Sequence, residues 1–554
     1  MLWRLFIFNA FSVILVASIV FPGPKYPPTK GEVWPKPQEQ IKHETFYKLV
    51  PSTFKFTEKG ETCHILKAAI ERYMDVLKDI YHLSWRHGRR VGQHSHNVTH
   101  NVSSYPNIEE LQINLRSPCE TYPQMGMDEK YSLNVSAVSS LSSDSIWGIL
   151  RGMESFSQLF YISHDFKNVF INTTEIVDYP RYPHRGLLID TSRHYISVSN
   201  ILKTLDAMEM NKLNVLHWHI VDDQSFPFES EKFPQLSEKG AYDPAMTYTK
   251  HNVEHIVNYA RDRGIRVLPE FDVPGHTRSW GEAYPNVLTQ CYYPAPGLYE
   301  IDLSNNETYE ISLGPMDPSK NITYKLISEL FQEVKERFPD NYLHVGGDEV
   351  ELGCWQSNPD LQKFMRDHNM SGPSDLHSYF MNKTIPILGD NTKTIVWQEV
   401  FDEGVPLPND AIVQVWKQED GNELKRILNA GLKLIYSASW YLDHLQSGGD
   451  WEAYYKADPR QMITRNKAMY NLDNIIGGEA CMWGEVVDDS NVISRVWPRS
   501  SAVAEKLWSA ESINNRYRSI ARDVYHRIEE HACRMNRRKI RAQPPNGPGF
   551  CIYN

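Results

Sequence analysis

The chain has 554 residues, of which 41% are hydrophobic and 23% charged, and its 30 glycines and 33 prolines are too few for a collagen-like or low-complexity protein. The formal net charge is −11, and no long basic run is present, so we expect no binding of nucleic acid. The length allows several domains, or fewer if one is a large barrel. Fourteen tryptophans and 30 tyrosines suggest a use beyond core packing, such as an aromatic-walled ligand site.

The first 21 residues have the layout of a secretory signal peptide. Arg4 precedes an apolar run from Leu5 to Phe21, and Pro22 ends that run. An uncleaved membrane anchor is the alternative, although a run of this length is at the lower limit for a membrane span. No later stretch approaches transmembrane length, so we expect a protein that enters the secretory pathway and has no stable membrane span.

Eight N-x-S/T sequons support the same route, because chance gives fewer in a chain of this length. We predict glycosylation at these asparagines and a surface position for their segments. They are Asn97, Asn101, Asn134, Asn172, Asn306, Asn321, Asn369 and Asn382.

Seven cysteines fit an oxidising compartment and leave at least one unpaired. Cys481 lies in the apolar run IIGGEACMW, which is typical of a buried strand, so we expect it to be the free thiol. The other six pair in chain order in the simplest arrangement, but six cysteines allow 15 connectivities and the sequence alone leaves the order open. They are Cys63, Cys119, Cys291, Cys354, Cys533 and Cys551.

Residues 22–182 mix short strand-like and helix-like patterns, which predicts a small α+β domain. Residues 22–60 are rich in Pro and Lys and are predicted to be extended. Helices are expected over 62–91 and near 144–161, and strands over 111–115, 131–136 and 170–180.

From residue 183 to the end, apolar strand-like runs alternate with helical runs. Eight such steps predict a (β/α)8 barrel, the TIM-barrel form of the α/β class. A doubly wound open sheet is the alternative, but its GxGxxG turn after the first strand is absent. The predicted strands are 186–190, 214–220, 265–271, 342–347, 394–399, 411–416, 432–439 and 475–483.

Polar and aromatic residues follow the ends of these strands. The carboxyl ends of all barrel strands meet at one face, so these residues are expected to form one functional site. They are Asp190, Arg193, His219, Asp222, Asp272, His276, Asp348, Glu349, Trp397, Glu399, Trp416, Tyr441, Asp443, Trp483 and Glu485.

The sharpest local signal is HVGGDEV at 344–350. Two glycines at a strand end indicate a close approach of the backbone to another group. The adjacent carboxylates Asp348 and Glu349 point in different directions and can have different roles, one desolvated and protonated and the other ionised. The alternative is that both acids complement the dipole of a following helix.

Several other residues also have structural alternatives. His276 either shifts the pKa of a catalytic carboxylate or forms a hydrogen bond to the backbone. Asp222 either takes part in the functional site or, with Asp223, caps a turn or a helix. The tryptophans are either core residues or walls for sugar faces. Arg193 either pairs only with Asp190 or donates to vicinal hydroxyls as a planar fork.

Two other functions remain open from the residues. In a metal-dependent barrel hydrolase, His217 and His219 would be ligands, with Asp222 and His276 nearby, but the later strand ends offer Trp and acids rather than histidine pairs. A secreted glycan-binding protein with an inactive site would require the loss of an acid, and none is missing.

Seven stretches resemble glycoside hydrolase family 20, the β-N-acetylhexosaminidases, and in particular the animal lysosomal or secreted hexosaminidase subunits. The resemblance implies the barrel, the preceding α+β domain, chain-order disulfides, a homo- or heterodimer, a glycan substrate and no metal or organic cofactor. The stretches are HRGLLIDTSRHY (184–195), KLNVLHWHIVDDQSFPFES (212–230), RGIRVLPEFDVPGHTRSWG (263–281), YLHVGGDEV (342–350), VWQEVFD (396–402), WYLDH (440–444) and GGEACMWGE (477–485).

The resemblance also implies a role for each site residue in a substrate-assisted, retaining hydrolysis. Glu349 would be the general acid and base, Asp348 would hold the N–H of the substrate's 2-acetamido group, and Tyr441 would donate to its carbonyl. Asp222 and His276 would orient Glu349. The hydroxyls would be bound by Arg193 and Glu485, and the sugar would be enclosed by Trp397, Trp416 and Trp483.

Position 443 bears on specificity. In the mammalian members of the family that the chain resembles, the subunit that acts on anionic sugars has Asn-Arg after Tyr-Leu, and the subunit that prefers neutral sugars has Asp-Leu. This chain has Asp443-His444 at these positions. Asp443 near the sugar's 6-position would repel a sulfate or carboxylate there, so we predict a preference for neutral sugars. A protonated His444 would partly offset that repulsion.

Overall fold

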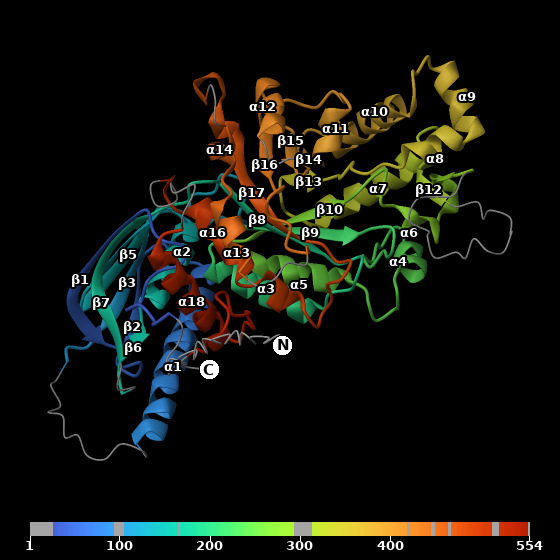
Figure 1. Ribbon diagram of the computed structural model, residues 1–554. Helices are drawn as coiled ribbons and strands as arrows, with labels where there is room; N and C mark the ends of the chain where they lie inside the picture. The colour runs from blue at the N-terminus through green and yellow to red at the C-terminus, as the bar shows by residue number, and fades with distance from the viewer. Residues whose placement is uncertain are drawn as a thin grey trace, which may run out of the picture.

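The structure is a computed structural model that describes residues 26–92, 105–163, 167–292, 313–417, 421–444, 449–463, 467–511 and 520–551, with the backbone alone for 85–92. An N-terminal sheet with two helices lies beside a closed barrel that is surrounded by helices (Figure 1). The predicted signal peptide, 1–21, lies outside the described residues.

The N-terminal unit is a seven-stranded sheet covered by two helices, as expected for an α+β domain. Its strand order is β1-β7-β4-β5-β3-β2, with β6 on the edge of β7. The predicted helices and strands of this part are confirmed, and β1 and β2 lie in the segment expected to be extended. Two strands were not predicted: β5, whose sequence VSSLSS is rich in serine, and β6, which has two residues. The elements are β1 (Glu39–Lys48), β2 (Lys55–Gly60), α1 (His64–Gly92), β3 (Glu110–Leu115), β4 (Tyr131–Val135), β5 (Val138–Ser143), α2 (Ile146–Gln158), β6 (Tyr161–Ile162) and β7 (Val169–Asp178).

Eight parallel strands close into a barrel, which confirms the predicted fold and rules out the open sheet. The order around the barrel is β10-β13-β14-β15-β16-β17-β8-β9. The strands are β8 (His184–Asp190), β9 (Val215–Val221), β10 (Arg266–Phe271), β13 (Tyr342–His344), β14 (Lys393–Trp397), β15 (Ile412–Val415), β16 (Lys433–Tyr436) and β17 (Ile475–Met482).

Helices follow the strands and cover the outside of the barrel (Figure 1). The longer ones are α3 (Val198–Met210), α5 (Lys250–Arg261), α7 (Asn321–Arg337), α9 (Pro359–Asp367), α10 (Pro373–Thr384), α12 (Asn422–Asn429), α16 (Arg499–Trp508) and α18 (Arg522–Arg537). Shorter elements are α4 (Gln235–Gly240), α6 (Arg278–Gly281), η1 (Pro285–Val287), β11 (Leu288–Gln290), β12 (Leu313–Met316), α8 (Leu352–Ser357), η2 (Ile385–Leu388), α11 (Gln398–Asp402), α13 (Trp451–Lys456), α14 (Pro459–Met462), η3 (Lys467–Met469), η4 (Leu472–Asn474) and α15 (Val492–Val496).

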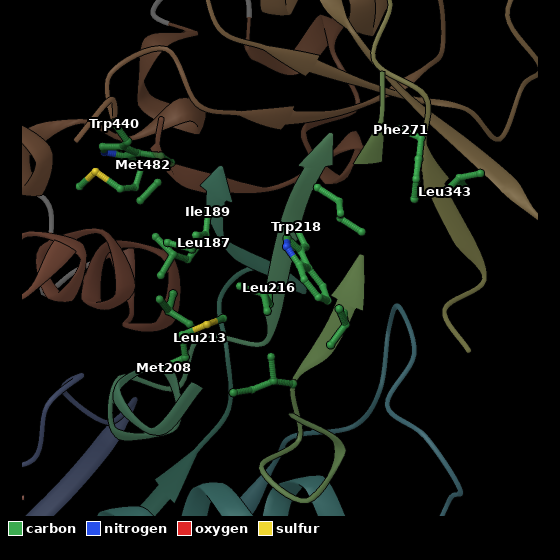
Figure 2. Close-up of a cluster of buried hydrophobic side chains, with 14 of the residues drawn as sticks. Leu187, Ile189, Met208, Leu213, Leu216, Trp218, Phe271, Leu343, Trp440 and Met482 are labelled. Atoms are coloured by element: carbon green, nitrogen blue, oxygen red, sulfur yellow. The ribbon is translucent and has the colours of Figure 1, made fainter. Parts of the chain in front are cut away.

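Alternation along the strands divides the barrel into an apolar shell and a polar interior. Leu216 and Trp218 of β9 belong to the large apolar cluster between strands and helices, with Leu187 of β8 and Met208 of α3 (Figure 2). His217, between them on β9, instead bonds to carboxylates that come from other strands. The strands of the barrel therefore present polar side chains to its axis, below the end where the predicted site lies.

Buried ion pairs join the N-terminal unit to the barrel. The Glu129 carboxylate accepts hydrogen bonds from Arg151 at 2.8 Å and from Arg185 of β8 at 2.6 Å, and all three side chains are buried. We propose that the domain boundary follows Tyr182, between the end of β7 and the start of β8.

The chain-order disulfides are confirmed: Cys63–Cys119, Cys291–Cys354 and Cys533–Cys551. Cys481 is free and buried in β17, as predicted. Among the described residues, no helix is both long and apolar enough to cross a membrane.

The predicted surface position of the sequons is wrong for Asn172. Its side chain is buried, its amide donates to the His43 carbonyl at 2.7 Å and its oxygen accepts from Tyr161 at 2.8 Å, because β1 packs beside this part of β7. Four others, Asn134, Asn321, Asn369 and Asn382, are exposed, and Asn97, Asn101 and Asn306 lie outside the described residues.

Candidate active site

A cavity of about 150 Å³ opens at the carboxyl end of the barrel strands. Of the residues predicted at the strand ends, all line it except Asp190, Asp222 and Glu399, which are buried. The lining is Arg193, His219, Asp272, His276, Asp348, Glu349, Trp397, Trp416, Tyr441, Asp443, His444, Trp483 and Glu485.

The Gly346-Gly347 turn brings the backbone against Asp272. Both glycines have positive φ, at 65° and 95°, and a Cβ on Gly346 would overlap the Asp272 carboxyl. The Gly347 N–H donates to Asp272 at 2.8 Å. Gly346 therefore packs against this carboxyl and Gly347 packs against Val400. The turn delivers Asp348 and Glu349 to the cavity in a loop that precedes α8.

Asp348 and Glu349 differ sharply in exposure. Asp348 is 7% exposed, whereas the Glu349 side chain is 57% exposed and has a strained backbone, with φ at 47°. His276 lies between them, with its Nε2 3.6 Å from Asp348 and 3.7 Å from Glu349. Of the two acids, the desolvated one is Asp348, and Glu349 extends toward the solvent.

A second buried carboxyl, Asp272, accompanies Asp348. Oxygens of the two carboxyls and a nitrogen of His276 all lie within 4.8 Å of one another. Burial and the charge of Asp348 raise the pKa of Asp272 well above its usual range. Burial alone would also raise the pKa of Asp348, but the adjacent His276 outweighs burial and lowers it. The pair thus holds one proton on Asp272 and leaves Asp348 ionised, which corrects the expectation that the desolvated acid of the Asp-Glu motif is protonated.

Asp222 anchors the network from below the cavity. It is fully buried, hydrogen-bonds to His219 Nε2 at 2.8 Å and to His276 Nδ1 at 3.2 Å, and forms an ion pair with Arg193 at 2.9 Å. Burial would raise the pKa of Asp222, but His276 and Arg193 lower it far below its usual range. Burial would likewise lower the pKa of His276, but Asp222 and Asp348 raise it well above the usual range. An ionised Asp222 therefore fixes a protonated His276 beside both candidate acids.

Three indoles and a phenol form the walls. The Trp397 and Trp483 ring centres are 5.9 Å apart, and Trp416 stacks on Tyr441 at 6.1 Å. Trp397 is held by a 2.7 Å hydrogen bond from its Nε1 to Glu270. Burial and the neighbouring Cys481 raise the pKa of Tyr441 well above its usual range, so the phenol stays a hydrogen-bond donor. The tryptophans are therefore both packed into the barrel end and exposed to the cavity.

Charged groups surround the mouth of the cavity. Arg193 lies 5.1 Å from the Trp483 ring centre and pairs with Asp190 at 3.1 Å. Asp443 is 16% exposed, with His444 3.9 Å away, and Glu485 is exposed. These side chains offer a guanidinium donor and carboxylate acceptors to a ligand.

The histidines of the metal hypothesis are part of a buried hydrogen-bond network. The Nδ1 of His217 hydrogen-bonds to Glu479 at 2.8 Å, and its Nε2 forms an ion pair with Glu270 at 3.0 Å. Burial would lower the pKa of His217, but Glu479 and Glu270 raise it to about 9. A metal ion bound at His217 would have to displace this proton. His219 is held in the same way between Glu270 and Asp222, and the same balance raises its pKa to about 10.

Two stretches of the chain match known families. Residues 182–511 match the catalytic domain of glycosyl hydrolase family 20, and residues 33–159 match a domain described as beta-acetyl hexosaminidase like. The chain belongs to glycosyl hydrolase family 20. This family 20 chain is a glycoside hydrolase, and its fold matches the one that the resemblance implied.

Relatives of this family 20 chain cover most of its length. Beta-hexosaminidase subunit beta of Mus musculus is 44% identical over 89% of this chain and 87% of its own length. The alpha subunit of Bos taurus is 40% identical over 94% of both chains. The structure of Flavobacterium johnsoniae chitobiase superposes with a TM-score of 0.74 at 30% identity, over 92% of this chain and 73% of that one.

Proposed function

We propose that this protein is an exo-β-N-acetylhexosaminidase that removes terminal N-acetylglucosamine and N-acetylgalactosamine with retention of anomeric configuration. The observation that carries the proposal is the small cavity lined by three tryptophans together with Asp348 and Glu349. A cavity of this size accepts one terminal sugar, which supports exo action. The packed walls around Trp397 and Trp483 confine the sugar's 2-acetamido group.

The substrate's own acetamide oxygen attacks the anomeric carbon, in place of an enzyme nucleophile. Asp348, ionised and buried, accepts from the acetamide N–H and balances the positive charge that develops as the ring closes. Tyr441 donates to the acetamide carbonyl and holds it near the anomeric carbon. Fixing the reacting amide in this way removes an entropic barrier to the attack.

Glu349 protonates the leaving oxygen and later accepts a proton from the attacking water. Its exposed side chain at the cavity's edge suits a group that must reach both the leaving group and water. His276, fixed by Asp222, orients Glu349 and moderates the charge between the two acids. Arg193 and Glu485 bind the ring hydroxyls, which the charges at the cavity mouth support.

The reaction needs no metal or organic cofactor in this scheme. The substrate is a glycan, which we propose to be a glycolipid, N-glycan, glycosaminoglycan or chitin oligomer. The protein forms a homo- or heterodimer in this proposal, because relatives are named as beta-hexosaminidase subunits. It is lysosomal or secreted, as the predicted signal peptide of residues 1–21 suggests.

One experiment tests the function directly. The purified protein is given chitotriose labelled at the reducing end, and products are followed by chromatography and by NMR of the released sugar. We expect single N-acetylglucosamine units to leave from the non-reducing end, first as the β-anomer. Internal cleavage, a first product with the α-anomer, or loss of activity on chelation would contradict the proposal, and the last would favour the metal hypothesis.

Asp443 gives a pH-dependent specificity. Burial raises the pKa of Asp443 to about 6. Above that pH the carboxylate repels a sulfate on the sugar's 6-position, and as pH falls below it the repulsion is lost. The kcat/KM ratio of 6-sulfated to neutral aryl glycoside is therefore expected to rise about tenfold from pH 7 to pH 5, the size expected for one nearby charge pair.

Two variants separate Asp443 from its neighbour. In Asp443→Asn the ratio of 6-sulfated to neutral kcat/KM is expected to be high at every pH and to lose most of its pH dependence. His444→Gln should keep most of the pH dependence, because Asp443 is still present. A ratio that does not change with pH in the wild-type protein, or a pH dependence that disappears only in His444→Gln, would refute the role of Asp443.

A further inference from the structure

A cavity of about 450 Å³ lies between α1, the end of α2 and the end of α18. It reaches the amino end of the barrel, because Arg72 of its lining donates to the Asp262 carbonyl, just before β10, at 3.1 Å. The active site opens at the opposite, carboxyl end. Five side chains that line this cavity are cationic and two are acidic. The cations are Arg72, Arg534, Arg537, Arg538 and Lys539, and the acids are Asp75 and Asp79.

Buried carboxylates fix two of these arginines at the cavity wall. Arg72 donates to Glu209 at 2.6 Å, and Arg538 donates to Glu154 at 2.9 Å. Both glutamates are buried. The Nε of Arg72 is buried and has no hydrogen-bond partner among the residues that the structure describes. The two guanidinium groups are therefore held in place, and the protein does not use all of the donors of Arg72.

The end of α18 gathers positive charge that its carboxylates do not cancel. Burial, together with repulsion from Arg537 and Arg538, lowers the pKa of Arg534 to about 10, although Glu530 lies 3.6 Å away. Burial and the nearby arginines also lower the pKa of His531 well below its usual range. The cations of this segment thus repel one another, and a bound anion would relieve that repulsion.

Lys539 adds a further charge at a cost in stability. It follows α18 with a left-handed φ of 66°, the conformation that glycine usually supplies after a helix end. A lysine there is strained, and its side chain is exposed. Cations at a helix end can serve only to complement the helix dipole. That alternative does not account for Arg72, which comes from α1 and lines the same cavity.

We propose that this cavity binds a sulfate or phosphate ester. Arginine side chains offer such oxyanions paired N–H donors in a planar fork. Apolar side chains also line the cavity, Val76 and Ile80 from α1 and Phe160 from beyond α2, and they suit the carbon body of an ester. Asp75 and Asp79 are exposed on α1, so we expect the oxyanion at the α18 side of the cavity. The site is separate from the active site and does not depend on the proposed reaction.

The test measures anion binding by the thermal unfolding midpoint and by calorimetry, at an ionic strength kept constant with sodium chloride. Inorganic sulfate and phosphate are expected to raise the midpoint of the wild-type protein above its value in chloride alone. Glucose 6-sulfate and glucose 6-phosphate should bind more tightly than the free ions, and glucose should not bind. Arg537→Ala should weaken binding of both esters about tenfold or more, because charge-assisted hydrogen bonds are lost.

Lys539→Gly separates binding from folding. Glycine relieves the left-handed strain, so the midpoint without anion should rise, while affinity for the esters should fall about threefold to tenfold. The control Arg116→Ala, which removes an exposed ion pair with Asp144 in the N-terminal unit, should leave the affinity unchanged. Turnover of a neutral aryl glycoside should be the same in all three variants and the wild-type protein, because the cavity lies at the other end of the barrel.

Three results would overturn the proposed site. The first is a midpoint of the wild-type protein that sulfate and phosphate raise no more than chloride does. The second is an affinity for the esters that changes in neither Arg537→Ala nor Lys539→Gly. The third is equal affinity for free sulfate and glucose 6-sulfate, which would exclude the ester as the ligand. A wild-type protein that binds the esters but hydrolyses no glycoside would keep this site and overturn the proposed function instead.

Discussion

Glu349→Gln is expected to lower kcat on an unactivated disaccharide by about 10²- to 10⁴-fold, the usual contribution of general acid catalysis. The loss should be much smaller for an aryl glycoside with an acidic phenol as leaving group, because that group departs without protonation. Substrate binding should persist, since glutamine keeps the size of the side chain. Steady-state kinetics on the two substrates and calorimetry with the product measure these three quantities.

The Glu349 account has a matched control and a clear refutation. Glu238→Gln changes an exposed carboxylate on α4, outside the cavity, and should leave kcat unaltered. Azide, a nucleophile that needs no base, should partly restore turnover of the aryl glycoside by Glu349→Gln. Near-normal kcat on the disaccharide, or equal losses on both substrates, would show that Glu349 is not the acid.

Asp348→Asn is expected to lower kcat by about 10²- to 10³-fold on both kinds of substrate, because the charge that stabilises the cyclised intermediate is lost whatever the leaving group. The equal effect on both substrates separates it from Glu349→Gln. A thiazoline that mimics the cyclised intermediate should bind the variant much more weakly, while binding of N-acetylglucosamine changes little.

The same variant also tests the buried carboxyl pair. Without the charge of Asp348, one of the causes that raise the pKa of Asp272 is removed. The thermal unfolding midpoint of Asp348→Asn, compared with that of the wild-type protein, shows whether the variant is folded. A folded variant that keeps full thiazoline affinity would contradict the role of Asp348.

The fold followed from local patterns. Eight apolar strands with helices between them are enough to predict a barrel, because each step repeats the same local pattern. The barrel then placed residues as distant as Arg193 and Glu485 at one face, since the carboxyl ends of all its strands meet there. The serine-rich β5 was missed because small polar residues carry no apolar alternation.

The parts that failed depend on contacts between distant segments. Asn172 is buried because β1 lies beside it, and nothing within β7 reveals that neighbour. Asp272 was placed at the site by its strand end but given no role, because its protonation depends on Asp348, which follows the neighbouring barrel strand β13 and is distant in sequence. Glu270, which holds Trp397 and His219, lies within a continuous apolar strand and gives no signal of its own.

The central claim is that the substrate's acetamide attacks the anomeric carbon, and one series measures this directly. Aryl glycosides whose N-acetyl group carries no, one, two or three fluorines differ mainly in the nucleophilicity of the amide oxygen. The account predicts that kcat/KM of the wild-type protein falls steeply with each added fluorine, because each fluorine makes the amide oxygen a weaker nucleophile. A kcat/KM that stays constant across the series would mean that another group attacks, and would contradict the mechanism.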